Sequence, residues 1–312
     1  MKKKTPTIKM SLKKIIDSKP KNLAFLVGNG INRYPNNQTA FSWEDLLIIV
    51  WNKFSKEKII KIPNGISLTE FYDLLDVETS NFSATNSKIQ KEICEMLKKS
   101  EYSNHHSKFL QKAKQLNSPV LTTNFDLNLP HSLELKSFKD ESSIKYYPWT
   151  IYFSNEKLEN PTNGFGVWYI NGYINSHFSL RLGLSHYMGS VGKARKSLYR
   201  EVDDTGLFKC KDIKQWHGRN TWLDIFFKKS LCIFGLTLNE NEVFIRWLLI
   251  ERAKYFNKFP LMKKDIKSYY VFNKNKDCDD INFEGKKNFL KKIGFEMIGV
   301  ENYDDIYKCP WE

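Results

Sequence analysis

Two apolar runs in this chain, Leu23–Val27 and Leu231–Phe234, show no alternation between hydrophobic and polar residues. A strand with one face in water alternates, whereas a strand covered by helices on both faces is apolar at nearly every position. The two runs therefore predict central strands of a mostly parallel sheet with helices packed on both faces.

The rest of the chain alternates strand patterns with helical patterns, which predicts an α/β layered fold. We treat residues 1–312 as a single domain. Residues 61–117 carry apolar residues at helical spacing and predict a helical insertion or crossover. Residues 189–219 are basic, contain glycines and are weakly periodic, so we expect a mobile loop or lid. The core strands are expected at about 22–28, 118–124, 167–171, 231–235 and 268–273.

The segment Thr122–Asp126 follows a short apolar strand and ends in polar side chains. In open α/β sheets, ligands bind beyond the carboxyl ends of the strands. Asn124 and Asp126 are therefore candidate site residues. The alternative is an ordinary Asx-turn, because Asn and Asp favour turns for reasons of their own.

Glycines follow both of the apolar runs. Gly28 and Gly30 come after the first run, and Gly235 comes directly after the second. A glycine has no Cβ, so its backbone can approach a phosphate or a ribose closely. Position 33 is Arg, so the full dinucleotide fingerprint G-x-G-x-x-G is missing. Tight turns without a ligand are an equally good explanation of these glycines.

The formal net charge of +14 suggests a nucleic-acid partner. However, only seven of the 49 Lys and Arg residues are Arg, the residue that suits bidentate recognition of phosphates and bases. We therefore do not expect specific nucleic-acid binding.

The five cysteines are scattered, and none of them forms a C-x-x-C pair. This spacing argues against a zinc ribbon or a disulfide framework, so no metal site is expected. The longest apolar runs are far too short to span a bilayer, and the basic N-terminus is not followed by the apolar stretch of a signal peptide. We expect a cytoplasmic protein that does not enter the membrane.

Five short motifs follow one another in a recognisable order. They are Gly28-x-Gly30-x-Asn32, Trp43-x-x-Leu46-Leu47, Thr122-Thr123-Asn124-Phe125-Asp126, Asn171-Gly172 and Gly235-Leu236-x-Leu238. In this order they resemble the landmarks of the sirtuin-like NAD-binding family. The chain is most similar to the bacterial sirtuin-like proteins of anti-phage defence, and the resemblance covers most of residues 22–255.

The resemblance implies a Rossmann-like fold that binds NAD+ as its substrate. The residues implied on the adenosine and pyrophosphate side are Gly28, Asn29, Gly30 and Asn32. The residues implied beside the nicotinamide ribose are Thr123, Asn124 and Asp126. Gly235 and Leu236 are implied to close over the adenine ribose.

The chain departs from the family at two points. The zinc-binding cysteine module is missing, so protein deacylation is not expected. Asn171 stands where the family has the histidine that serves as general base, and an amide cannot take up a proton. The catalytic candidates are therefore Asn124, Asp126 and Asn171. His177 and His186 are candidates to replace the base, and the alternative for each is an ordinary surface or loop histidine.

Three functions remain open, and the least favoured is a basic nucleic-acid-associated domain. The other two involve NAD+. The first is an NAD+ glycohydrolase effector that stays inactive until triggered, as a homo-oligomer or together with a separate sensor protein. The second is a regulatory module that binds NAD+ or ADP-ribose without cleaving it.

Overall fold

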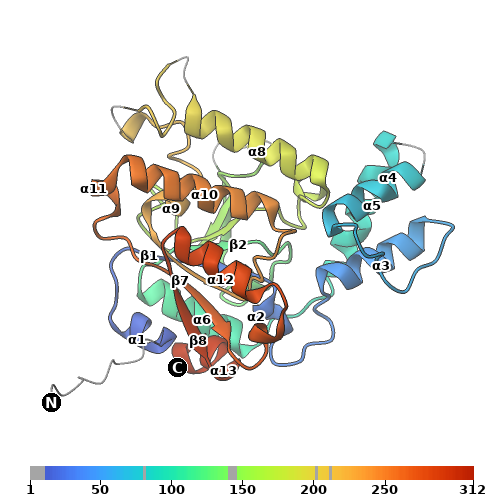
Figure 1. The fold of residues 1–312 in the computed structure, drawn as a ribbon, viewed down its shortest axis with the longest axis horizontal. Helices are drawn as coiled ribbons and strands as arrows, with labels where there is room; N and C mark the ends of the chain where they lie inside the picture. The colour runs from blue at the N-terminus through green and yellow to red at the C-terminus, as the bar shows by residue number, and fades with distance from the viewer. Residues whose placement is uncertain (1–10, 80–81, 140–145, 201–202, 211–212) are drawn as a thin grey trace.

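The computed structural model describes residues 11–79, 82–139, 146–200, 203–210 and 213–312 (Figure 1). The remaining residues lie outside this description, and they include small parts of the predicted helical insertion and lid. The described residues form one sheet of eight strands. The strands are β1 (Leu23–Val27), β2 (Val120–Thr122), β3 (Lys136–Phe138), β4 (Tyr152–Ser154), β5 (Val167–Tyr169), β6 (Ser230–Phe234), β7 (Ser268–Asn273) and β8 (Phe295–Val300).

The strand order across the sheet is β3-β4-β5-β2-β1-β6-β7-β8. The six strands from β5 to β8 in this order are mutually parallel, and β3 and β4 run antiparallel at one edge. The predicted fold class, α/β with a mostly parallel Rossmann-like sheet flanked by helices, is confirmed.

Thirteen α-helices and four short 3₁₀ helices occur among the described residues. The α-helices are α1 (Leu12–Asp17), α2 (Gly30–Arg33), α3 (Trp43–Phe54), α4 (Leu68–Glu78), α5 (Phe82–Leu97), α6 (Asn104–Gln115), α7 (Asn128–His131), α8 (Leu184–Tyr199), α9 (Trp222–Lys228), α10 (Val243–Lys258), α11 (Pro260–Lys263), α12 (Phe283–Lys292) and α13 (Asp304–Tyr307). The 3₁₀ helices are η1 (His177–Ser179), η2 (Ile213–Gln215), η3 (Asp277–Asp279) and η4 (Cys309–Trp311).

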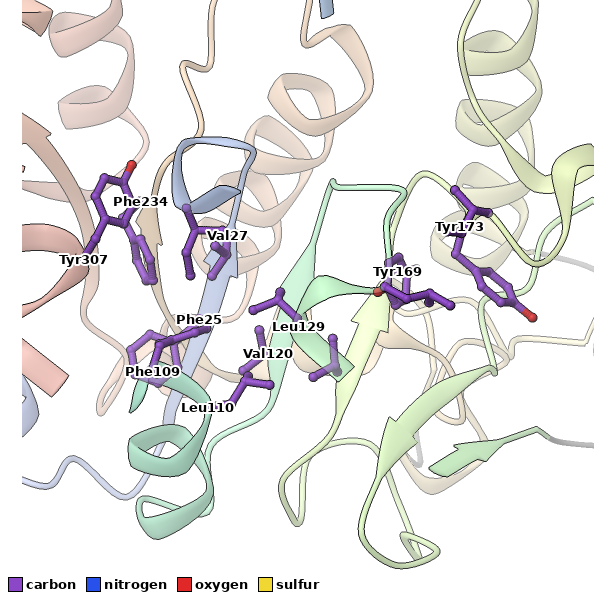
Figure 2. Close-up of a cluster of buried hydrophobic side chains, with 14 of the residues drawn as sticks. Phe25, Val27, Phe109, Leu110, Val120, Leu129, Tyr169, Tyr173, Phe234 and Tyr307 are labelled. Carbon is purple, nitrogen blue, oxygen red and sulfur yellow. The ribbon is translucent and has the colours of Figure 1, made fainter. Parts of the chain in front are cut away.

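The two faces of β1 lie in two separate hydrophobic clusters, which explains why its sequence does not alternate. Phe25 and Val27 belong to the cluster under α6 and η4, whereas Leu26 belongs to the cluster under α8, α9, α10 and α12. The Phe25 ring meets Phe109 of α6 edge-to-face, with ring centroids 5.3 Å apart (Figure 2). Both faces of the central strand are therefore sealed by helices.

The helical segment 61–117 contains both of the predicted possibilities. Its first two helices, α4 and α5, pack with α3 in a group beside the sheet (Figure 1), where Trp51 stacks on Phe71 with centroids 4.5 Å apart. The third helix, α6, is a crossover, because it buries Phe109 and Leu110 directly against the sheet.

The prediction of a loop at 189–219 was wrong for its first part, which belongs to α8. The buried face of this helix is built mainly from small residues, among them Ser190, Ala194 and Ser197, so its hydrophobic periodicity is weak. Farther along the segment, Trp216 is 1% exposed and its Nε1 donates to the Ser197 carbonyl at 2.8 Å. These described parts are packed against the body of the protein.

The edge strand β3 was not predicted. Lys136 and Ser137 are exposed, so the strand lacks the apolar face that marks a strand in sequence. Among the described helices, none combines the length and apolar character needed to cross a membrane.

Replacement of Phe109 tests the packing of α6 on the sheet. Phe109 is fully buried between Phe25, Phe234 and Trp311. Phe109→Ala is expected to lower the free energy of unfolding by about 3–5 kcal/mol, through lost burial and a cavity. Urea denaturation measures the change. Ile60→Ala, at a side chain that is 98% exposed, serves as the control and is expected to change stability by less than about 0.5 kcal/mol. Equal effects of the two substitutions would contradict the assignment of α6 to the core.

Candidate functional site

The predicted site residues meet at one edge of the sheet. Strands β5, β2, β1 and β6 are neighbours and parallel, so their carboxyl ends lie side by side. The residues at or just beyond these ends are Gly28, Asn29, Gly30, Asn32, Thr123, Asn124, Asp126, Asn171, Gly235 and Leu236. The structure therefore brings together residues that are far apart in sequence, at the edge where open α/β sheets bind ligands.

The turns after β1 and β6 are hydrogen-bonded to each other. The Gly28 N–H donates to the Phe234 carbonyl at 3.1 Å, and the Gly30 N–H donates to the Gly235 carbonyl at 2.8 Å. A Cβ on Gly28 would lie 2.4 Å from the Gly235 oxygen. Gly235 has φ of +66°, which favours glycine.

Tyr307 of α13 lies against the same two turns. A Cβ on Gly30 would lie 2.2 Å from the Tyr307 hydroxyl oxygen and 2.7 Å from the Gly235 Cα. Tyr307 is 4% exposed, and its ring packs on Tyr34 with centroids 5.1 Å apart. The glycines thus serve close contacts within the protein, and a role for them toward a phosphate stays a prediction.

The turn after β2 is held to β1 by backbone and side-chain hydrogen bonds. The Thr122 hydroxyl donates to the Val27 carbonyl at 3.0 Å and accepts the Asn124 N–H at 3.1 Å. The Asn124 side-chain amide lies 3.4 Å from the Gly28 carbonyl, to which it donates. The backbone of Thr123 donates to the same Val27 carbonyl at 3.2 Å.

Asp126 forms the Asx-turn that was considered as the alternative, and it does more. Its Oδ1 accepts the N–H of Asn128, two residues on, at 3.0 Å. Its Oδ2 accepts Nδ2 of Asn32 at 2.7 Å. The carboxylate is 6% exposed, and burial raises its pKa, although the two donors act in the opposite direction. Asp126 therefore ties the turn after β2 to α2.

His106 belongs to this network and was not predicted as a site residue. Its Nε2 lies 3.0 Å from Oδ1 of Asn32, and its ring is fully buried. Burial, with a smaller contribution from His105, lowers the pKa of His106 to about 3, so the ring is neutral near pH 7. The only trace in the sequence is the spacing Ser103-x-x-His106 at the start of a helix, where the His106 ring accepts the backbone N–H of Ser103.

Asn171 lies just past the end of β5 and is 3% exposed. Its backbone carbonyl accepts the Arg181 N–H at 2.9 Å, but its side-chain Oδ1 is buried without a hydrogen-bond partner among the described residues. Buried acceptors are normally paired, so this oxygen suits a donor from water or from a ligand hydroxyl. Gly172 follows with φ of +90°, and a Cβ there would lie 2.1 Å from the Ser179 carbonyl.

The two histidines considered as replacement bases differ in their positions. Nδ1 of His186 accepts the backbone N–H groups of Leu182 and Gly183 at 3.2 and 3.3 Å, at the start of α8. Burial lowers the pKa of His186 to about 4. This residue caps a helix, which gives it a structural role. His177 lies in η1, half-buried beside the Phe178 ring.

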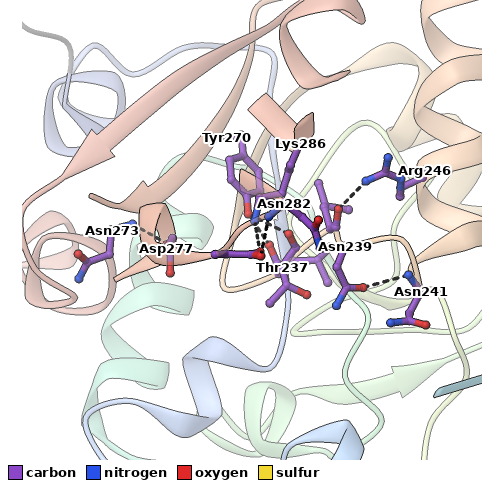
Figure 3. Close-up of polar contacts among 12 residues, drawn as sticks. Thr237, Asn239, Asn241, Arg246, Tyr270, Asn273, Asp277, Asn282 and Lys286 are labelled. Carbon is purple, nitrogen blue, oxygen red and sulfur yellow. Dashed lines mark hydrogen bonds and ion pairs between the residues drawn. The ribbon is translucent and has the colours of Figure 1, made fainter. Parts of the chain in front are cut away.

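The turns after β6 and β7 form the remaining part of the edge (Figure 3). The Tyr270 hydroxyl donates to the Leu236 carbonyl at 2.9 Å, and Nη1 of Arg246 donates to the Leu238 carbonyl at 2.9 Å. Asn273 ends β7, is 3% exposed, and was not predicted. Its signal in the sequence is the one that Asn124 and Asn171 share, a polar amide closing an apolar strand.

A cavity of about 190 Å³ lies beside this network, lined by Leu97, Lys98, Ser100, Leu127, Asn128, His131, Ile174 and Asn175. Pockets that hold drug-sized ligands usually have volumes of about 300–1,000 Å³. A dinucleotide therefore needs more room than this cavity offers. Among the described residues, no group of three or more His, Cys, Asp or Glu side chains is placed to hold a metal ion.

No protein-family model matches this sequence, and no curated protein matches it. The sirtuin-like resemblance rests on the order of the motifs and remains a proposal.

Substitution of the turn glycines tests whether the turns after β1 and β6 pack as closely as described. Gly30→Ala is expected to lower the free energy of unfolding by about 1–3 kcal/mol, because the new methyl group meets Tyr307 and Gly235. Gly285→Ala in α12 is the matched control, since nothing lies within 4 Å of its Cβ, and it is expected to raise stability by up to about 1 kcal/mol. Thermal or urea denaturation measures both. A Gly30→Ala variant as stable as the control would refute the close packing.

The buried His106 also predicts a pH dependence of stability. The unfolded chain takes up this proton below an ordinary pKa of 6.5, whereas the folded protein takes it up only near a pKa of 3. Stability is therefore lost as the pH falls from about 6.5 toward 3, at up to about 1.4 kcal/mol per pH unit for this group. Urea denaturation at pH 7, 6 and 5 should give a shallower dependence for His106→Gln than for the unsubstituted protein. Parallel curves would contradict the prediction.

Proposed function

We propose that the edge formed by β5, β2, β1 and β6 binds NAD+ and that the protein hydrolyses the bond between nicotinamide and ribose. The main support for the proposal is that four of the sirtuin-like motifs lie at one edge of the sheet. Motifs from residues 28, 122, 171 and 235 lie at adjacent carboxyl ends of one parallel sheet.

Cleavage of the bond between nicotinamide and ribose needs little help from a general base. NAD+ supplies a good leaving group, because nicotinamide departs as a neutral molecule from a cationic ring. The protein must then hold the ribose, place a water molecule and stabilise the positive charge that develops on the sugar. Uncharged amides can do the first two tasks.

Asn124 and Asn171 are suited to these tasks. The buried Oδ1 of Asn171, which has no partner among the described residues, would accept a hydrogen bond from a ribose hydroxyl. Asn124, on the neighbouring strand end, would orient the ribose or the water. Asp126 would act indirectly, through the residues it holds, since both of its oxygens already accept hydrogen bonds.

The turns after β1 and β6, which are implied to bind the adenosine and pyrophosphate, are less well suited to a ligand in this arrangement. The Gly30 N–H is taken by the Gly235 carbonyl, and Tyr307 lies against Gly30. Binding of a dinucleotide there requires the two turns to separate. Within the proposed function of an anti-phage defence effector, this closed arrangement is the inactive state, and a trigger, a homo-oligomer contact or a separate sensor protein would shift the turns.

The alternative, a regulatory module that binds NAD+ or ADP-ribose without cleaving it, is favoured by one observation. Asn171 cannot act as a general base, and general acid–base help is worth about 10²–10⁴-fold in rate. Calorimetry that shows NAD+ binding without nicotinamide release would select this alternative. A gain of activity in Asn171→His would support it further.

Removal of the Asn124 amide tests hydrolysis directly. Nicotinamide release from NAD+ is measured by chromatography, with and without candidate activating partners. Asn124→Ala is expected to lower the rate by at least about 100-fold, because the ribose or water loses its positioning. Asn257→Ala, at an exposed position of α10, is the control and should leave the rate unchanged. The hydrolase proposal fails if NAD+ stays intact in every condition, or if Asn124→Ala reacts as fast as the control.

A further inference from the structure

A chain of hydrogen bonds starts at the backbone of Ser103, at the beginning of α6. The Ser103 N–H donates to Nδ1 of His106 at 3.0 Å. The Ser103 carbonyl lies 3.3 Å from the same nitrogen, but it already accepts the backbone N–H of His106 at 2.9 Å. A backbone amide always carries its hydrogen, so Nδ1 is the acceptor. The neutral ring must then carry its proton on Nε2.

The proton on Nε2 determines the orientation of the Asn32 side chain. Nε2 of His106 donates to Oδ1 of Asn32 at 3.0 Å. The NH₂ group of Asn32 must therefore face the other way, where its two acceptors are Oδ2 of Asp126 at 2.7 Å and Oδ1 of Asn29 at 3.1 Å. Nδ2 of Asn128, 3.4 Å from Oδ1 of Asn32, requires the same orientation.

We propose that His106 is a positioning residue for the candidate site, acting through the Asn32 amide on the Asp126 carboxylate after β2 and on Asn29 after β1. The inference rests on the proposed NAD+ function. If the side-chain amide of Asn32 were flipped, its carbonyl oxygen would face the Asp126 carboxylate. Two hydrogen-bond acceptors would then lie against each other. The turn after β2, which also carries Asn124, would then lose its connection to α2.

His106 does not act on a substrate itself. Its ring is fully buried, and both ring nitrogens are occupied by Ser103 and Asn32. The neighbouring His105 provides a matched comparison. Its ring lies 4.2 Å from that of His106, centroid to centroid, and it is 8% exposed. Its Nε2 pairs with the Ile31 carbonyl at 2.7 Å, and it forms no hydrogen bond with the side chains of Asn32 or Asp126.

The test compares three variants of the full chain, His106→Phe, His106→Gln and His105→Phe. Steady-state NAD+ hydrolysis, measured with and without candidate activating partners, gives kcat and KM, and thermal denaturation gives stability. His106→Phe is expected to lower kcat by about 10- to 100-fold with KM nearly unchanged, the usual scale for loss of a partner that orients a site residue. His106→Gln should recover most of kcat, since its amide supplies an N–H donor near the position of Nε2. His105→Phe should lose stability but keep kcat.

A second readout separates this inference from the proposed function. The side-chain NH₂ signals of Asn32 are assigned by NMR through Asn32→Asp, and their shifts are compared among the variants. The inference is supported if His106→Phe moves these signals and His105→Phe does not. It is overturned if neither variant moves them, or if both variants lower kcat equally. If the unsubstituted protein neither binds nor cleaves NAD+, with or without candidate activating partners, the proposed function fails, and the Asn32 signals still decide whether His106 orients this amide.

Discussion

The parallel pairing of β1 with β2 on one side and β6 on the other determines where every candidate residue lies. Val27 is opposite Thr122 and Phe234, so the next residue of each strand falls at the same height of the sheet edge. Thr122 is in turn opposite Tyr169 of β5, which brings the segment containing Asn171 to the same edge. Both faces of these strands pack into apolar clusters, and a slip of one residue would exchange the side chains that enter the two clusters.

The parts of the fold that sequence could predict are those with strong local patterns. Leu23–Val27 is apolar throughout because both of its faces are buried, and that property is visible in the chain itself. The helix α8 was missed because its buried face consists mainly of small residues, which hydrophobic periodicity does not detect. The strand β3 was missed because it is exposed and held by its neighbour β4 alone. These elements depend on their tertiary surroundings more than on local preference.

The candidate site also contains residues that the sequence could predict and one that it could not. Asn124 and Asp126 were predicted because they follow an apolar strand, and Asn171 because it stands where the sirtuin-like family has its histidine. Parallel strands bring such ends together. His106 was not predicted, because its contact with Asn32 joins residues 74 positions apart and has no local pattern. Asp126 closes the expected Asx-turn with one oxygen and accepts a hydrogen bond from Asn32 of α2 with the other. Polar side chains at strand ends can thus shape their own loop and hold a distant element with the same group.

The separation of β1 from β6 along the chain has a consequence for folding. Asn22 and Lys228, which flank this pair of strands, are hydrogen-bonded although they are 206 positions apart. Contacts of such long range form late and slowly, because the chain must lose the entropy of closing a large loop before the contacts can stabilise it. Until β6 arrives, one side of β1 is an open, apolar strand edge, the kind of surface that pairs with other chains. The candidate site is therefore expected to assemble last, and the partly folded chain should need a chaperone's protection most while this central edge is open.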